Sequence, residues 1–378
     1  MSIYLNVSNS LQPLSVRLAS DLQATDQNAF VKQWVVTQTE GMNSWLKQNI
    51  AKQNGITANI NFCKPNDIVA EIYRKGLKAG KQIINTENIR WCIYELLDSS
   101  IFKTTYTDIA SYYLNNDIKR IALSDELADL FDQYQVYRHE TVQIWDDRLI
   151  HNQVAEDWQE WIWHQIKIKL GDAYQDRVEM AKLLIDGLLI EDVQVNIKNK
   201  IPALHLFGIA VITPYYLQIF HALAKFIDIH LYLVNPCPEQ IWMDDHSEQQ
   251  ITKLLQKRKK QRKDVDHLLV GNDLLLNWGG IIKESFKLLM DNDDFVNVYN
   301  EEDAVPIVEP KTLLKKIQYD IYNNLNKQSR KLLTPLDYKD GSITLNGAFT
   351  PVREVEILYN YLVEIGRASC RERVYVLV

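Results

Sequence analysis

Residues 3–23, IYLNV-SNS-LQPLSVRLASDLQ, contain a strand pattern, a turn and a helix pattern in direct succession. The first five residues predict a short strand, and the Ser-Asn-Ser that follows is typical of a turn. Leucines then recur at helical spacing, at positions 11, 14, 18 and 22. A strand that leads through a short turn into a helix is the first unit expected of an α/β protein.

The same alternation continues along the chain. Strand patterns at residues 34–37 and 57–62 are each followed by a helix pattern, the second of which begins at Pro65. Strand patterns return at residues 203–209 and 227–234, with a helix predicted between them at 214–226. Alternating strands and helices predict a parallel sheet, so the fold class is α/β.

Helical periodicity dominates the middle of the chain, from residue 88 to residue 198. We expect this segment to be a helical subdomain inserted into the α/β one. Residues 241–335 are mostly polar and predict helices and loops. A last strand is expected at residues 342–345 and a last helix at 352–365, and we expect this helix to break at Gly366. The chain is therefore expected to be a truncated fragment, with residues 366–378 as a non-native tail.

Composition and charge exclude several classes of protein. The chain has 378 residues, of which 46% are hydrophobic and 24% charged, an ordinary globular balance for two or three domains. No apolar run approaches the roughly 18 residues of a membrane helix, and no signal peptide is visible, so a cytoplasmic location is expected. The net charge of −7 does not favour a protein coated in nucleic acid but permits a local basic groove. The 4 cysteines are far apart, which indicates neither a zinc site nor a disulfide framework.

The sheet lacks the residues of an ATP site. A parallel α/β ATPase needs G-x-x-x-x-G-K-[ST] after its first strand, because backbone N–H groups and the lysine hold the phosphates. Here residues 7–13 read VSNSLQP, without glycine or lysine. A later strand should carry a carboxylate that holds magnesium, but residues 206–210 read LFGIA. These substitutions argue against an active ATPase motor.

Other chemical signals are weaker. Nuclease chemistry needs clustered carboxylates around metal ions, and we expect the acidic groups at residues 146–147, 244–245 and 301–303 to lie in solvated loops instead. Trp145, Trp158, Trp161 and Trp163 could stack on bases, but helical spacing favours core packing for Trp158 and Trp161. The seven cations between Lys253 and Lys263 fit a phosphate backbone or a solvated helix face equally well.

The predicted helix at residues 124–138 has two distinct faces. Leu127, Leu130, Phe131 and Tyr134 form an apolar stripe at spacings i, i+3, i+4 and i+7. Carboxylate and amide side chains lie on another face, at positions 129, 132 and 133, and an arginine ends the segment. Such groups can read the edges of bases. On the residues alone, a solvated helix face remains the favoured alternative.

Several long blocks resemble the RecC family, the gamma subunit of bacterial exodeoxyribonuclease V, which is the RecBCD helicase–nuclease. The blocks are TEGMNSWL at 39–46, GITANINF at 55–62, DLFDQYQVYR at 129–138, YLQ at 216–218, IHLYLVNPC at 229–237 and REVE at 353–356. The resemblance runs in order from residue 1 to about residue 365.

The resemblance implies a fold and a domain plan. Residues 1–87 and 199–240 would form a P-loop NTPase-like domain, similar to a superfamily-one helicase that has lost its ATP site, and residues 88–198 its inserted all-helical subdomain. A helical and loop segment would follow at 241–335. Residues 336–365 would begin a truncated second helicase-like domain.

It also implies a function without catalytic residues, metal or cofactor in this chain. RecC scans the unwound single strand for the Chi sequence during double-strand-break repair, in a heterotrimer with RecB and RecD, whose motors use ATP and Mg. The DNA partners would be a duplex end and single-stranded DNA. The alternatives are an active ATP-dependent helicase motor and a purely structural scaffold whose channel reads nothing.

Residues implicated in Chi recognition map by this resemblance onto seven positions that keep their residue type: Gln38, Asp129, Leu130, Asp132, Gln133, Arg138 and Arg177. Other family positions carry different side chains here, namely Glu40, Ser44, Lys64 and Ala70. The resemblance makes a strand-lining role for the helix at 124–138 the favoured interpretation. The four changed positions leave the recognised sequence open.

Overall fold

The computed structural model describes residues 2–25, 31–77, 81–114, 116–238, 240–243, 245, 270–290, 296, 298–302, 305 and 310–375. The chain divides into two compact units. The first comprises Met1–Met243 with Leu275–Val305, and the second comprises Asp244–Leu274 with Pro306–Val378.

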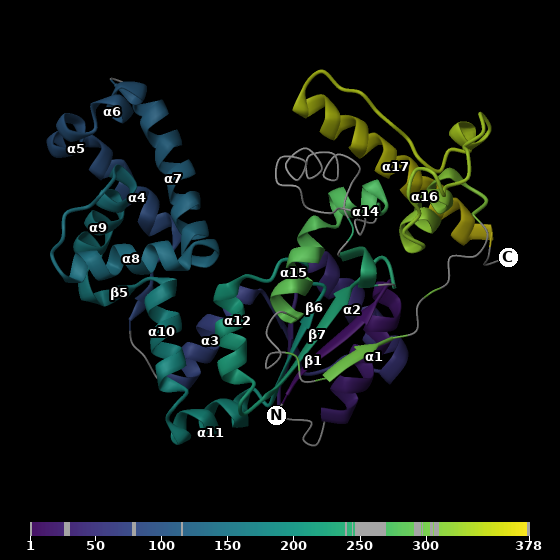
Figure 1. Cartoon of the computed structure of the whole chain (residues 1–378), viewed down its shortest axis with the longest axis horizontal. Helices are drawn as coiled ribbons and strands as arrows, with labels where there is room; N and C mark the ends of the chain where they lie inside the picture. Colours follow the sequence, from purple (N-terminus) through teal and green to yellow (C-terminus); the bar gives the residue numbers. More distant parts are fainter. Residues whose placement is uncertain are drawn as a thin grey trace, which may run out of the picture. The chain divides into compact units, whose positions relative to one another are not determined.

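The first unit is built on a six-stranded sheet in which every pair of neighbouring strands is parallel (Figure 1). In spatial order the strands are β3 (Ile60–Cys63), β2 (Gln33–Val36), β6 (Ala203–Phe207), β7 (Asp228–Val234), β1 (Ile3–Ser8) and β8 (Val298–Glu301). The five strands predicted before residue 240 are therefore confirmed, as is the α/β class with a parallel sheet. The edge strand β8 was not predicted, because its four residues, VYNE, alternate too briefly to show a pattern.

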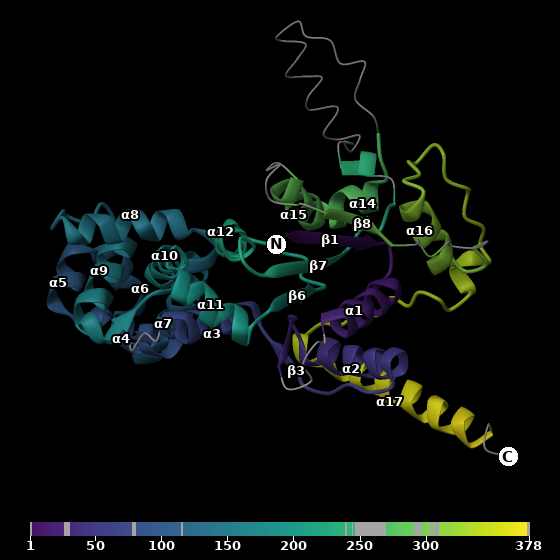
Figure 2. The same cartoon turned by 90° about the horizontal axis from the view of Figure 1, so that it is seen from below.

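Both faces of this sheet are covered by helices, which explains why its strands read as nearly continuous apolar runs. The helices α1 (Leu11–Thr25) and α2 (Glu40–Asn54) pack on one face through Leu14, Leu18 and Leu46. Figure 2 shows them on the opposite side of the sheet from α15 (Gly280–Met290). The second face also receives α3 (Pro65–Leu77), α10 (Arg177–Gly187), α11 (Glu191–Lys200) and α12 (Pro214–Leu223).

The ends of these helices follow the local sequence. Thr39 accepts a hydrogen bond from the backbone N–H of Met42 at 3.2 Å and so caps α2, and Gly55 ends the helix with φ of 77°. Thr213 caps α12 in the same way, with Pro214 in its first turn. The caps place the first turns of the helices next to the carboxyl ends of the strands that precede them.

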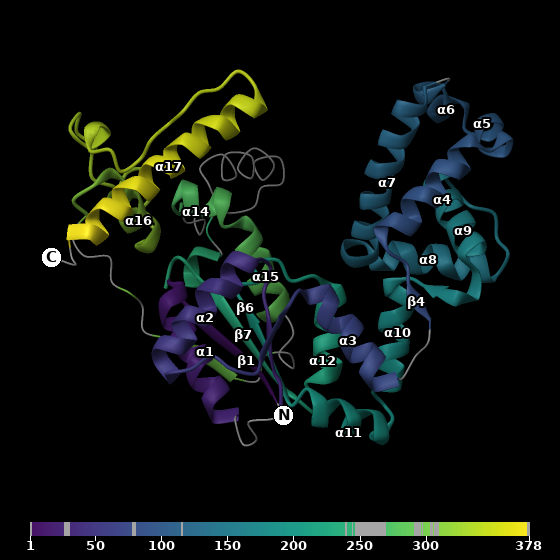
Figure 3. The ribbon, with the colours of Figure 1, turned by 180° about the vertical axis from the view of Figure 1, so that it is seen from behind.

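A separate hydrophobic cluster holds together the helices between β4 and β5 (Figure 3). These helices are α4 (Thr86–Asp98), α5 (Ser100–Thr105), α6 (Thr107–Tyr113), α7 (Asp117–Tyr137), α8 (His139–Ile150) and α9 (Trp158–Leu170). Phe102, Phe131 and Trp163 are fully buried at its centre. The prediction of an all-helical segment is wrong in one detail. A 3-10 turn at Gly171–Ala173 leads into β5 (Tyr174–Gln175), which pairs in parallel with β4 (Gln82–Ile83), and two-residue strands leave no periodic signal.

The second unit contains α16 (Leu313–Tyr322), a 3-10 turn (Asp337–Lys339) and α17 (Pro351–Tyr375). Residues 342–345 are irregular, so the predicted strand is wrong. A short apolar run becomes a strand only when a neighbouring strand accepts its backbone hydrogen bonds, and the described residues offer none. The predicted final helix exists but continues through Gly366 to Tyr375, so the predicted break is also wrong.

Three shorter elements complete the described residues: η2 (Gln240–Met243), α14 (Asp273–Trp278) and the isolated bridge residue Val270. Within the described part of the chain, no helix is long and apolar enough to cross a bilayer.

Candidate functional site

A cavity of about 610 Å³ opens where three parallel strands end. Gln38 follows β2, Lys64 follows β3, and Ile209 follows β6, and all three residues line the cavity. The opposite wall is formed by the last turns of α7 and the first residues of α10 and α12. The carboxyl edge of a parallel sheet is the usual place for a ligand site in an α/β protein.

The structure brings together four of the seven predicted site residues in this cavity. Gln38, Asp132, Gln133 and Arg177 line it, together with Lys64 and Ala70, two of the positions that differ from the family pattern. Since Asp132 and Gln133 lie on α7, the predicted separation of that helix into an apolar and a polar face holds at these residues: Phe131 is buried, and Gln133 is exposed.

The other three predicted residues lie outside the residues that line the cavity. Asp129 is exposed to solvent, and Leu130 packs against the helical cluster. Arg138, at the junction of α7 and α8, places its guanidinium 5.3 Å from the ring centroid of Tyr134. Helical spacing alone cannot separate Asp129 from Asp132, because the two are three residues apart and share one side of the helix.

Asp132 and Arg177 form an ion pair in the cavity wall. The Nη2 atom of Arg177 lies 3.0 Å from Oδ1 of Asp132, and Nε lies 3.3 Å from the same oxygen. The two side chains are 16% and 25% exposed, so neither group is wholly withdrawn from water. In the structure this acid and this cation are therefore partners of each other.

The backbone of Arg177 is held from two sides. Its N–H donates to Oε1 of Gln135 on α7 at 2.9 Å, and its carbonyl oxygen accepts from the hydroxyl of Tyr215 on α12 at 3.2 Å. Asp176, just before it, caps α10 by accepting from the N–H of Glu179 at 2.8 Å. The guanidinium therefore projects from a preorganised backbone.

Two tyrosines in the cavity wall were not found by sequence reasoning. Tyr216 donates a hydrogen bond from its hydroxyl to Oδ1 of Asn66, and burial raises its pKa far above the ordinary value, so the phenol stays neutral. Tyr137 lines the cavity and is 59% exposed. An exposed aromatic ring next to a cation and an amide offers a base a stacking surface. Both tyrosines lie within blocks of the family resemblance, at 129–138 and 216–218.

Mostly apolar side chains gather at the ends of β6 and β7. A small hollow of about 170 Å³ at the ends of β6 and β7 is lined by Leu11, Gly208, Leu233 and the fully packed Phe286 of α15. The Oγ atom of Ser285 donates to the carbonyl oxygen of Ala210 at 2.7 Å, which ties α15 to the strand end.

The turn after β1 is also engaged within the protein. Oδ1 of Asn9 accepts from the N–H of Val305 at 2.8 Å, and Nδ2 of Asn9 donates to the carbonyl oxygen of Val305 at 3.0 Å. In a phosphate-binding loop, groups at this position face the nucleotide. The turn offers neither the glycine backbone nor the lysine that nucleotide phosphates require, and no lysine lines the hollow.

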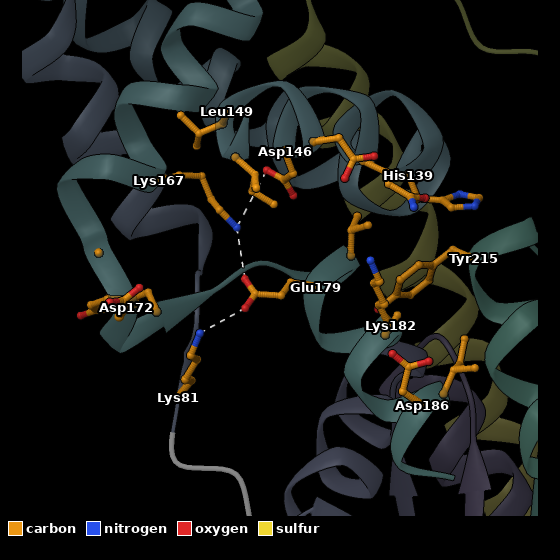
Figure 4. Close-up of a pocket in the computed structure, with 18 of the residues that line it drawn as sticks. Lys81, His139, Asp146, Leu149, Lys167, Asp172, Glu179, Lys182, Asp186 and Tyr215 are labelled. Atoms are coloured by element: carbon orange, nitrogen blue, oxygen red, sulfur yellow. Dashed lines mark hydrogen bonds and ion pairs between the residues drawn. The ribbon is translucent and has the colours of Figure 1, made fainter. Parts of the chain in front are cut away.

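A further cavity of about 620 Å³ lies beside α8, α9 and α10 (Figure 4). Asp146 belongs to its wall, so the expectation that residues 146–147 form a solvated loop is wrong: both lie in α8. The side chain of Asp146 is only 16% exposed and accepts from Nε1 of Trp163 at 2.9 Å. Burial, with Asp176 nearby, raises the pKa of Asp146 to about 7.

The predicted core packing of Trp158 and Trp161 is confirmed, and Trp145 and Trp163 are buried in the same cluster. No group of three or more potential metal ligands occurs in the part of the chain that the structure describes. The basic run at residues 253–263 lies outside the described residues, as do Asp244 and Asp303.

These features define a class: an α/β protein with a parallel sheet and a cavity at the strand ends. The chain belongs to the RecC family, because residues 3–324 match the family model described as the RecC N-terminal domain.

Curated relatives carry the name RecBCD enzyme subunit RecC. The protein of Escherichia coli K12 is 28% identical over 372 residues, which cover 88% of this chain and 32% of that protein. The Haemophilus influenzae protein is 25% identical, with 95% of this chain and 36% of that protein covered. The Mycolicibacterium smegmatis protein is 24% identical, and the match covers 96% of this chain and 31% of that protein. The chain thus spans about a third of the length of these relatives.

Proposed function

We propose that this chain is the strand-reading, N-terminal part of a RecC-type subunit. In this role it acts without catalytic residues of its own, contacts single-stranded DNA unwound from a duplex end, and recognises Chi for a RecB- and RecD-containing complex in cytoplasmic break repair. Membership of a RecB- and RecD-containing complex is supported by the name of the relatives, RecBCD enzyme subunit RecC. The observation that carries the strand contact is the convergence of Gln38, Gln133, Asp132 and Arg177 on one cavity.

The proposal divides the work between positioning and reading. Arg177 and Lys64 are the cations in the cavity wall and would contact phosphate oxygens. Gln38 and Gln133 carry amide groups that both donate and accept, so they suit the edges of bases. Tyr137 would stack on a base. Asp132 would hold the guanidinium of Arg177 rather than read a base alone.

The finer domain plan is part of the same proposal. A P-loop NTPase-like, superfamily-one helicase-like domain at residues 1–87 and 199–240 is supported by the parallel sheet, in which β1 lies between β7 and the edge strand β8. The inserted helical subdomain at 88–198 is supported by the separate core of α4 to α9, although α10 and α11 share the core of the sheet. Residues 241–335 would link to a second helicase-like domain beginning at 336–365, followed by a tail unlike the family at 366–378.

Titration of a fluorescein-labelled, single-stranded oligonucleotide tests the strand contact by anisotropy. Arg177→Ala should weaken binding to every sequence, whereas Gln133→Ala should change the preference between sequences by about 1–3 kcal/mol. Glu126→Gln is the matched control, because Glu126 is an exposed residue of α7 that does not line the cavity.

Reconstitution with RecB and RecD tests recognition itself. Gln133→Ala should then alter Chi-dependent cleavage and leave unwinding intact. If both variants bind and respond like the unmodified chain, the purely structural scaffold is the correct alternative. The active motor is disfavoured by the apolar packing around Phe286.

A further inference from the structure

A cluster of buried charges lies directly behind Arg177. Lys167 on α9 pairs with Asp176, lies 3.2 Å from an oxygen of Glu179, and lies 3.9 Å from Oδ1 of Asp146. Figure 4 shows Lys167 pointing between Asp146 and Glu179, with Lys81 on the far side of Glu179. Lys81 reaches Glu179 at 3.1 Å from the more exposed side.

The burial of Asp176 makes this cluster unusual. Its side chain has no exposed area, and the side chain of Lys167 is only 18% exposed. A buried carboxylate is costly unless a cation and hydrogen bonds compensate it. Lys167 is the cation paired with Asp176, and the pKa of Lys167 is raised because the acids around it outweigh its burial.

Asp176 sits at the centre of a segment that is fixed on every side. On its N-terminal side, Gln175 accepts from the hydroxyl of Tyr73 and from the N–H of Ile84, both at 2.9 Å. On its C-terminal side, Arg177 makes the contacts to α7 and α12 described above. Asp176 itself caps α10. The placement of Asp176 therefore bears on the position from which Arg177 enters the cavity at the strand ends.

We propose that Lys167 is a positioning residue for Arg177, acting through Asp176 and never touching the strand. This inference rests on the proposed function, in which Arg177 contacts DNA. Without the ammonium group, Asp176 and Asp146 would be two neighbouring buried carboxylates. Asp176 would then be buried without its cation and would move toward water, which weakens the cap of α10 and displaces Arg177.

The experiment measures anisotropy of a fluorescein-labelled, single-stranded oligonucleotide with the full chain. Lys167→Met should weaken binding about tenfold, which is a typical size for the interaction between neighbouring residues. Lys167→Arg keeps the positive charge and should therefore retain most of the affinity. Lys169→Met is the matched control, because Lys169 lies on the same helix, is 42% exposed and pairs with Glu95. It should bind like the unmodified chain.

A double variant separates positioning from general destabilisation. If Lys167 acts through Arg177, the combination of Lys167→Met with Arg177→Ala should bind no more weakly than Arg177→Ala alone. Additive losses, or unchanged binding in Lys167→Met, would overturn the inference while the proposed function stands. Unchanged binding in Arg177→Ala would overturn both.

Circular dichroism shows whether Lys167→Met folds. If it does not, the same comparison is made with Lys167→Met combined with Asp146→Asn, which removes one of the two buried negative charges. That pair should fold and still bind about tenfold more weakly than Asp146→Asn alone, by the same coupling. Equal binding by these two proteins would count against the positioning role.

Discussion

The contact between Asp132 and Arg177 changes the role expected of each residue. The periodicity of α7 places Asp132 on a polar face, where a carboxylate could accept from an exocyclic amine of a base. In the structure that carboxylate lies 3.0 Å from the guanidinium of Arg177. Its negative charge therefore orients a cation, and the two residues form one ion pair.

We expect the effects of these two residues on strand binding to be strongly coupled. Asp132→Ala frees the guanidinium to adopt other rotamers, so it should weaken binding even though it removes a negative charge from the cavity. Anisotropy titrations of Asp132→Ala, Arg177→Ala and the double variant should give a coupling energy of about 1 kcal/mol. Tighter binding by Asp132→Ala would show that simple repulsion of phosphate governs this position.

A stacked pair of histidines, of which His205 is fully buried and His230 partly buried, predicts how stability depends on pH. The rings of His205 and His230 stack at 4.8 Å beneath α1, and burial lowers the pKa of both from the ordinary 6.5. The folded state keeps these rings neutral, whereas the unfolded chain protonates them below about pH 6.5. The free energy of unfolding that the pair contributes is therefore present above that pH and lost as the pH falls below it.

Asp146 also makes stability depend on pH, but in the opposite direction: its pKa is raised in the folded state, so its contribution to stability is lost as the pH rises. Comparison with a histidine variant separates the two effects. Urea unfolding of the unmodified chain and of His230→Gln should be followed from pH 7.5 to pH 5. The unmodified chain should lose stability relative to the variant as the pH falls. Two parallel curves would mean that His230 titrates alike in the folded and unfolded states.

At the scale of the element, α15 packs against the ends of β6 and β7. Phe286 is buried at the ends of β6 and β7, and Ser285 binds the backbone of Ala210. We therefore expect no heat of ATP binding by calorimetry at micromolar to millimolar nucleotide. Phe286→Ala should cost about 3–5 kcal/mol of stability and still bind no ATP, since neither a lysine nor a glycine loop is present. Measurable ATP binding by either protein would revive the motor alternative.

Close packing between α3 and α10 depends on a glycine. A Cβ atom added at Gly187 would lie 2.2 Å from Cδ2 of Leu77, so the helices would have to move apart or the leucine to change rotamer. Gly187→Ala should lower the free energy of unfolding by about 1–3 kcal/mol in urea titrations.

Gly41→Ala is the control for that substitution. Gly41 lies in α2, and an added Cβ would meet no described atom within 4 Å, so alanine should leave stability unchanged or raise it by about 0.5–1 kcal/mol. Equal effects of the two substitutions would contradict the close approach of α3 and α10.

At the scale of the whole molecule, the distribution of charge determines how strongly the single-strand affinity should depend on salt. The net charge is −7, and the described cavity is lined by two cations, Lys64 and Arg177. Single-strand affinity should therefore fall gently with salt, with a log–log slope of about −1.4 if both contact phosphates. Arg177→Ala should reduce the size of that slope by about half. A steep slope in the unmodified chain would place the main phosphate contacts elsewhere.

The sequence alone was enough for five of the six strands of the sheet and for most of its helices, and it predicted the loss of an ATP site. These properties are local: apolar runs such as residues 229–234 predict buried strands, and VSNSLQP lacks phosphate ligands wherever it lies. The family resemblance suggested Gln38, Asp132, Gln133 and Arg177 as site residues before any geometry was known. Spacing along one helix could not show that Asp129 lies outside the cavity wall.

Only the tertiary structure decided which of these groups meet. Asp132 and Arg177 are 45 residues apart, and Lys167 reaches Asp176 from a different helix, so neither pair leaves a trace in local periodicity. The same holds for Asp146, which belongs to an acidic pair in the sequence and becomes buried because Trp163 and Lys167 pack over it. Periodicity reports which face of an element is apolar. The meeting of charges across elements depends on how those faces pack, and packing is a property of the whole fold.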